Sequence, residues 1–174
     1  MHIILESERL LFRPHQPTDL DDFCAMEMDP DVRRFVGGYP RTRENAEKRF
    51  PRRQAEAGTR LAVWATILKS EQQYIGRCGL YPHIDANGET VAGEASLSFY
   101  IATPYWGQGF ATEAGRAFVQ FGFGELGLHR IVTSVEQGND ASMRVLQKLG
   151  FSVAEIEKGP RTFYHFVLRK PTSA

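Results

Sequence analysis

The chain has 174 residues, of which 42% are hydrophobic and 24% are charged, and its 21 basic and 21 acidic residues leave a formal net charge of zero. This length suits one domain, and a chain of this size buries roughly 70% of its unfolded surface, which is enough for a stable core without disulfides or metal ions. The balanced charge excludes a general nucleic-acid binder, which needs a basic excess, but allows a local site for a small anion.

Neither the cysteines nor the first residues point to secretion. Cys24 and Cys78 are the only cysteines and neither has a CxxC partner, which favours two buried free thiols in a reducing cytoplasm over a disulfide. Charges occur within six residues of the start, and no other stretch reaches membrane length, so we expect neither a signal peptide nor a membrane span. These features predict a soluble cytoplasmic protein without a membrane partner.

The first 58 residues are predicted to be mostly helical after one strand. Residues 8–14 are typical of a strand, and residues 18–29 have the apolar spacing of a helix. A Gly-Gly-Tyr-Pro break at 37–40 follows a short helical turn. The heavily charged residues 42–57 indicate one exposed helix that Gly58 ends.

The middle of the chain changes to strands. Residues 60–69 and 74–84 are rich in β-branched and aromatic side chains and are separated by a polar SEQQ, which predicts an antiparallel pair. An Asn-Gly turn signal follows at 87–88. Residues 94–102 alternate and then become apolar, as expected of a more deeply buried strand that ends before Pro104.

The last third alternates helices and strands. Residues 112–123 belong to a helix with an apolar stripe, 129–136 to a strand, and 139–149 to a second amphipathic helix. Residues 151–158 and 162–169 complete the chain as two strands. This order of elements on one sheet predicts a single domain of the α+β or mixed α/β class.

A glycine-rich turn stands between the buried strand and the first of these helices, in the segment YWGQGFATEA. Gly107 and Gly109 lack a Cβ atom, so the amides of the turn can converge on a phosphate. The helix start adds unpaired N–H groups and the positive end of the helix dipole. We interpret the segment as an anion site; the structural alternative is a tight turn that happens to precede a helix.

Other phosphate ligands fit this segment less well than coenzyme A. A dinucleotide fold would need a third small residue where Thr112 stands, and further βαβ units that the 38 residues after Glu136 do not provide. A P-loop is absent because no Gly-Lys-Ser/Thr follows the glycines. The remaining candidate is a pyrophosphate that carries a long thiol-bearing arm, namely coenzyme A.

The chain resembles the GNAT N-acetyltransferases nearly end to end, in the branch that acetylates the N-terminal alanine or serine of ribosomal proteins and many other amines. Four segments carry the resemblance: ESERLLFRPHQPTDL, YIGRCGL, YWGQGFATEAGRAFVQFGFGELGLHRI and NDASMRVLQKLGF. The last two occur together at the separation seen in the family. The resemblance implies a single GNAT-like domain over residues 1–174, with a central, mostly antiparallel twisted sheet, flanking helices and acetyl-CoA inserted into a V-shaped split.

The same resemblance implies which residues bind the cofactor and that no metal takes part. Main-chain N–H groups of the glycine-rich loop would bind the pyrophosphate, the buried strand would run beside the pantetheine, and one asparagine would contact the pantetheine arm. These residues are Trp106, Gly107, Gln108, Gly109, Phe110, Ala111 and Thr112 in the loop, Phe99, Tyr100 and Ile101 in the strand, and Asn139. Trp106 stands where the wider superfamily often has Arg or Gln.

Direct attack by an amine needs no covalent enzyme intermediate, but the departing thiolate needs a proton or a hydrogen-bond donor. Many family members carry a tyrosine seven positions after the asparagine, and Leu146 stands there in this chain, which excludes a tyrosine acid at this site. The resemblance implies that Ser142 stabilises or protonates the thiolate. The alternative is that Ser142 only caps the helix start.

The general base is open between several groups. The branch often places a glutamate where Ser96 stands here, and Glu94 lies two residues earlier on the same face of the strand. Glu94 can act directly or through a water, or it can be a solvated charge at the strand start. His83 and His165 are alternatives, since histidine titrates near neutral pH.

The acceptor entrance is expected to be bordered by Trp64, Tyr81 and the turn at 35–39, because early helices cover that side in similar proteins; core packing is the alternative for Trp64. The acceptor would be a primary amine on a protein or peptide N-terminus or on a small molecule. A monomer and a homodimer both fit the sequence.

Three functions of different classes remain after the sequence is considered. The first is an acetyl-CoA-dependent N-acetyltransferase. The second is a non-catalytic acyl-CoA-binding or regulatory domain on the same fold, which Leu146 in place of tyrosine favours. The third is a nucleotide-dependent oxidoreductase, which the single glycine-rich turn allows and the paired segments disfavour.

Overall fold

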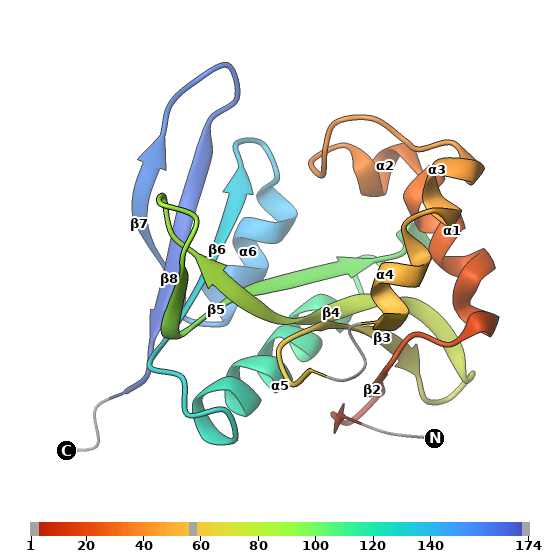
Figure 1. Ribbon diagram of the computed structural model, residues 1–174, viewed down its shortest axis with the longest axis horizontal. Coiled ribbons are helices and arrows are strands. Elements are labelled where there is room, and N and C mark those ends of the chain that lie inside the picture. The colour runs from red at the N-terminus through yellow and green to blue at the C-terminus, as the bar shows by residue number, and fades with distance from the viewer. Residues whose placement is uncertain (1–3, 56–58, 172–174) are drawn as a thin grey trace.

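A single eight-stranded sheet organises the computed structural model, which describes residues 4–55 and 59–171 (Figure 1). The strands lie side by side in the order β1-β2-β3-β4-β5-β6-β8-β7, and every neighbouring pair is antiparallel except β5 and β6. Their bounds are β1 Leu5–Glu6, β2 Leu10–Arg13, β3 Val63–Leu68, β4 Gln73–Ile84, β5 Thr90–Ile101, β6 Arg130–Glu136, β7 Ser152–Glu157 and β8 Phe163–Arg169. The predicted mixed α/β fold, with a mostly antiparallel sheet, is confirmed.

Helices cover both faces of this sheet. Figure 1 shows α1 to α4 gathered at the end of the sheet opposite β7 and β8, while the long α5 runs beneath the central strands. Their bounds are α1 Leu20–Met28, α2 Pro30–Arg33, α3 Arg43–Glu47, α4 Phe50–Ala55, α5 Phe110–Gly124 and α6 Asp140–Lys148. Two apolar clusters result, one containing Ala114 and Phe118 of α5 and one containing Phe23 of α1.

Three element boundaries differ from the sequence-based expectation. The single helix expected over residues 42–57 is two short helices, α3 and α4, because Pro51 cannot continue a helix from the preceding turn but fits the first turn of a new one. The expected stop at Gly58 lies outside the described residues. The strand expected at 8–14 is the second half of a hairpin formed by β1 and β2, and α5 begins at Phe110, two residues earlier than expected.

The sheet splits between β5 and β6, as expected for this fold. The two parallel strands pair only at Glu94 with Arg130, Ala95 with Ile131 and Ser96 with Val132. Beyond Ser96, β5 continues to Ile101 paired with β4 alone, and β6 continues to Glu136 paired with β8 alone. Two strand edges therefore face the opening, and such edges can pair with an extended ligand.

His15 lies among aromatic rings in the cluster under α1. Its ring centroid is 6.2 Å from that of Phe23, 6.0 Å from that of Phe50 and 5.9 Å from that of Tyr74. The residue is 4% exposed, and its ring nitrogens have no hydrogen-bond partner within the described chain. Burial first, and then the positive charge of Arg77, lower the pKa of His15 from 6.5 to about 3.

This buried imidazole should make the protein less stable in mild acid. Between pH 6.5 and 3 the unfolded chain binds a proton at His15 that the folded chain does not, so the free energy of unfolding falls as pH falls, by up to about 1.4 kcal/mol per pH unit. Urea unfolding at pH 7, 6 and 5 measures this slope. His15→Phe should give a shallower slope than the wild type, and an unchanged slope would contradict the assignment.

Candidate active site

The glycine-rich loop has a backbone conformation that favours glycine at two positions. Gly107 has φ +76° and Gly109 has φ +85°, both in the left-handed region that favours glycine, and Gly109 is the N-cap of α5. A Cβ atom on Gly107 would meet no heavy atom within 4 Å among the described residues. The first helical hydrogen bond joins the Glu113 N–H to the Gly109 carbonyl at 3.0 Å. The amides before Glu113 belong to the start of the helix, where N–H groups have no intrahelical acceptor and can bind an anion.

Arg9 holds this loop from the hairpin at the other end of the sequence. Its Nη1 donates to the Gln108 carbonyl at 3.1 Å, its Nε pairs with Glu113 Oε2 at 2.7 Å, and its guanidinium lies 4.3 Å from the ring centre of Phe110. Burial alone would raise the pKa of Glu113, but the Arg9 amide, the Ser7 hydroxyl and the Arg9 guanidinium outweigh it and hold that pKa below its usual range. No local sequence pattern predicts this role of Arg9, because the loop lies about a hundred residues away in the chain.

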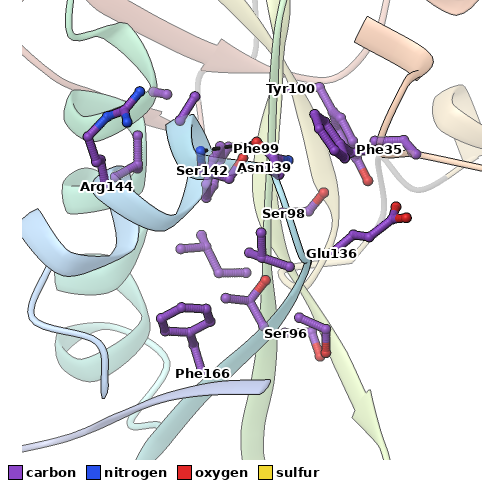
Figure 2. A pocket seen from close by; sticks show the side chains of 18 of the residues that line it. Phe35, Ser96, Ser98, Phe99, Tyr100, Glu136, Asn139, Ser142, Arg144 and Phe166 are labelled. Atoms are coloured by element: carbon purple, nitrogen blue, oxygen red, sulfur yellow. Dashed lines mark hydrogen bonds between the residues drawn. The ribbon is translucent and has the colours of Figure 1, made fainter. Parts of the chain in front are cut away.

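A cavity of about 1170 Å³ opens from this loop along the split in the sheet. Glycine-loop residues line one part of it. The end of β5 and the start of α6 line two other parts, as Figure 2 shows for Phe99, Tyr100 and Ser142. Of the predicted cofactor-binding residues, the cavity is lined by Phe99, Tyr100, Ile101, Trp106, Gly107, Gly109, Phe110, Ala111, Thr112 and Asn139. Gln108 does not line it, because its side-chain amide turns back to the Pro104 carbonyl at 3.2 Å.

The start of α6 places Asn139 and Ser142 on the cavity wall (Figure 2). Asn139 caps the helix, since its Oδ1 accepts the Ser142 N–H at 3.2 Å. This bond leaves the Ser142 hydroxyl in the first turn, beside the cavity. Leu146, one turn further on, is completely buried in the core, so the position that carries tyrosine in many relatives does not face the cavity here.

Glu94 lies behind the cavity wall. It is 7% exposed, its Oε1 accepts from Arg130 Nη1 at 3.0 Å, and it is not among the residues that line the cavity, whereas Ser96 and His83 are. Its Oε2 is buried without a hydrogen-bond partner in the described part of the chain. The carboxylate that the sequence singled out is thus held in an ion pair, and its role as a base stays a prediction.

The residues expected at the acceptor entrance divide into two groups. Tyr81 and Phe35 line the cavity, and burial raises the pKa of the Tyr81 phenol. Trp64 is only 1% exposed and packs in the core, so the structure supports core packing for Trp64 and not a place at the acceptor entrance. Tyr39 is 81% exposed and does not line the cavity.

Comparison with known proteins identifies the family to which this chain belongs. The sequence model described as "Acetyltransferase (GNAT) domain" matches residues 9–152. The chain belongs to the GNAT acetyltransferase family. Among the curated relatives, the uncharacterized protein YkkB of Bacillus subtilis is 31% identical over 74% of this chain and 72% of its own length. The uncharacterized N-acetyltransferase p20 of Bacillus licheniformis is 29% identical over 84% of this chain and 81% of its own length.

Solved GNAT structures share the fold over nearly the whole chain. A GNAT-family acetyltransferase from Bacillus anthracis superposes with a TM-score of 0.81 at 21% identity, covering 97% of this chain and 98% of its own. The ribosomal L7/L12 alpha-N-protein acetyltransferase RimL, in complex with coenzyme A, gives 0.78 at 13% identity with coverage of 97% and 98%. Spermidine N-acetyltransferase from Vibrio cholerae, in complex with CoA and spermine, gives 0.74 at 15% identity with coverage of 92% and 95%.

Among residues 4–55 and 59–171, no helix is long and apolar enough to cross a membrane. None of the His, Cys, Asp and Glu side chains in these ranges form a group of three or more that could hold a metal ion.

Proposed function

We propose that this GNAT protein is an acetyl-CoA-dependent N-acetyltransferase that moves the acetyl group to a primary amine by direct attack. The observation that carries the proposal is the continuous cavity that joins a left-handed glycine loop at a helix start to two unpaired strand edges. Acetyl-CoA has the matching chemistry, because its diphosphate suits the loop amides and its extended pantetheine arm suits a strand edge.

The residues present fit this co-substrate. Gly107 and Gly109 leave the loop open where a side chain would fill it, and Arg9 brings a positive charge within 3.6 Å of the place where a Cβ of Gly109 would stand. Phe99, Tyr100 and Ile101 would lie along the pantetheine arm, and Asn139 would face it from α6. When bound, acetyl-CoA supplies the activated acetyl group.

Ser142 is the group that we assign to the departing sulfur. Its hydroxyl faces the cavity at the first turn of α6, where it can donate a hydrogen bond to a developing thiolate. The helix start adds the positive end of its dipole at the same place, which also favours negative charge.

The acceptor is proposed to be a peptide or protein N-terminus or a small-molecule amine. RimL and the Vibrio cholerae spermidine enzyme share the fold, and their names give these two acceptor classes, so we include both classes in the proposal. We also propose that the chain is related to the ribosomal-protein branch of the family. The two buried free thiols suit a reducing cytoplasm.

A non-catalytic coenzyme A-binding domain is the second candidate. Buried Leu146 in place of a cavity-facing tyrosine favours it, since the site then lacks the acid that many relatives carry. Coenzyme A binding without turnover would support this candidate against the first.

Thiol release from acetyl-CoA tests the proposal against peptides starting with Ala or Ser, spermidine and aminoglycosides. We expect turnover with at least one of these amines. Ser142→Ala should retain the coenzyme A dissociation constant and lose about tenfold in kcat, because it removes one hydrogen bond to a developing charge, which contributes about 1.5 kcal/mol. Tight binding with no turnover across the whole panel would overturn the proposal.

A further inference from the structure

A serine, a histidine and a glutamate from three neighbouring strands form a hydrogen-bonded chain at the cavity. The Ser134 Oγ of β6 lies 2.8 Å from Nδ1 of His165 on β8, and His165 Nε2 lies 3.1 Å from Glu157 Oε2 on β7. The tautomer with its proton on Nε2 satisfies both contacts, because Nδ1 then accepts from the Ser134 hydroxyl and Nε2 donates to the carboxylate.

The register of the sheet explains why these three side chains meet. Ser134 and His165 are directly opposite each other in the antiparallel pairing of β6 with β8, and Glu157 comes from the strand on the other side of β8. Cross-strand partners have Cβ atoms about 5 Å apart, which puts a serine and a histidine within hydrogen-bond reach. Strand pairing thus orients the group without help from a loop.

Two members of this hydrogen-bonded group lie on the wall of the cavity, near the split in the sheet. Both Ser134 and His165 line the cavity. Val132 is the last residue of β6 paired with β5, and Ser134 is the next residue on the same face, about 7 Å further along the strand. Ile131 and Val135 of β6 are buried in the core and share the opposite face.

We propose that His165 is the general base for the acceptor amine, acting through the Ser134 hydroxyl, with Glu157 as its positioning residue. This inference rests on the proposed function. The ammonium gives one proton to the Ser134 oxygen while the Ser134 hydroxyl proton moves to His165 Nδ1, and Glu157 stabilises the imidazolium. The imidazolium afterwards releases that proton to solvent.

The rest of the transfer then balances. The freed lone pair of the nitrogen forms a C–N bond to the thioester carbonyl carbon, and the C–S bond breaks with its electron pair going to sulfur. A second proton of the nitrogen ends on that sulfur, where Ser142 donates a hydrogen bond. Ammonium and acetyl-CoA thus give an amide, coenzyme A thiol and one proton.

The competing bases have poorer geometry. Glu94 does not line the cavity and is paired with Arg130. His83 does line it, but its Nδ1 is 3.5 Å from the Ser96 hydroxyl and its Nε2 is 3.9 Å from Glu94, so neither contact is as short as those of His165. Only the group on β6, β8 and β7 joins a cavity hydroxyl, an imidazole and a carboxylate by two hydrogen bonds within the described residues.

Kinetics of the full-length chain with its best acceptor from the panel test this base. His165→Gln should lower kcat about 100-fold with an unchanged coenzyme A dissociation constant, and added imidazole should restore part of the rate. The loss should be greater for an alkylamine of pKa about 10 than for a peptide α-amine of pKa about 8, because the more basic amine needs more help. Glu157→Gln should cause a smaller loss of the same kind.

His129→Gln is the control: His129 is 61% exposed and does not line the cavity, and although it lies 3.6 Å from Glu94, the inference does not use that carboxylate, so the variant should behave as the wild type. An active His165→Gln variant, or an equal loss in His83→Gln, would overturn the inference. Absence of turnover in the wild type would instead count against the proposed function. In that case ¹⁵N NMR of His165 still tests the hydrogen-bonded group: a fixed Nε2–H tautomer that is lost in Glu157→Leu, which has no acceptor for that proton, supports it, and an averaged tautomer in the wild type overturns it.

Discussion

Replacing Gly109 with tryptophan is expected to abolish coenzyme A binding, with a loss of at least 100-fold in affinity. Gly109 is the N-cap of α5 at φ +85°, so an indole there would be forced into a strained backbone conformation and would stand over the amides that the diphosphate needs. Isothermal titration with coenzyme A measures the effect directly, without depending on any acceptor.

Gly127→Trp is the control that separates binding from backbone strain. Gly127 also has a left-handed φ, +65°, and its Cβ position is open, but it follows α5 and does not line the cavity. Both variants should lose about 1–3 kcal/mol of stability from the strained backbone, and only Gly109→Trp should lose the ligand. Wild-type affinity in Gly109→Trp would show that the diphosphate binds elsewhere.

The different outcomes at Gly109 and Arg9 show which parts of such a site a sequence can predict. A glycine turn before a helix is local, so the sequence alone located the permissive backbone at Gly107 and Gly109, both of which have left-handed φ values. Arg9 contacts the loop and α5 through the tertiary fold, and strand pairing brings His165 to Ser134 and Glu157; no periodicity of the sequence predicts either set of contacts. The split between β5 and β6 followed from resemblance to a family, because propensity does not determine where pairing stops.

Glu94 and residues 42–57 illustrate two other limits. Strand alternation correctly placed Glu94 and Ser96 on one face, but it did not reveal that Arg130 would take up the carboxylate. The charged run at 42–57 had the composition of one helix, and its break follows from one proline, which the composition of the run obscured.

A buried carboxylate joins the early helices, through Arg77 of β4, to the strand β5 that borders the cavity. Glu27 of α1 lies 2.5 Å from Nη2 of Arg77, 2.7 Å from Nε of Arg41 and 3.6 Å from Nη1 of Arg33. Arg77 is buried, and its guanidinium lies 4.5 Å from the ring centre of Tyr100 on β5. Burial alone would raise the pKa of Glu27, but the three guanidiniums outweigh it and hold the pKa below its usual range.

Glu27→Gln should therefore destabilise the fold by about 3–5 kcal/mol, because it leaves buried guanidiniums without a counter-charge. That is a large share of the roughly 5–15 kcal/mol that typical domains possess. Urea unfolding at pH 7 measures the loss. Because the folded pKa of Glu27 is lowered, its contribution is complete above the unfolded pKa and disappears as pH falls through the folded one, so the two proteins should converge in acid.

Glu44→Gln is the matched control, since Glu44 pairs with Lys48 on the surface and should cost less than about 1 kcal/mol. If Glu27→Gln does not fold, Arg41→Gln gives the milder test, because Arg41 is the most exposed of the three cations and should cost only about 1–2 kcal/mol. Stability within 1 kcal/mol of the wild type in Glu27→Gln would mean that water or rearranged side chains solvate the arginines, and that this carboxylate does not anchor α1 to β4 and β5.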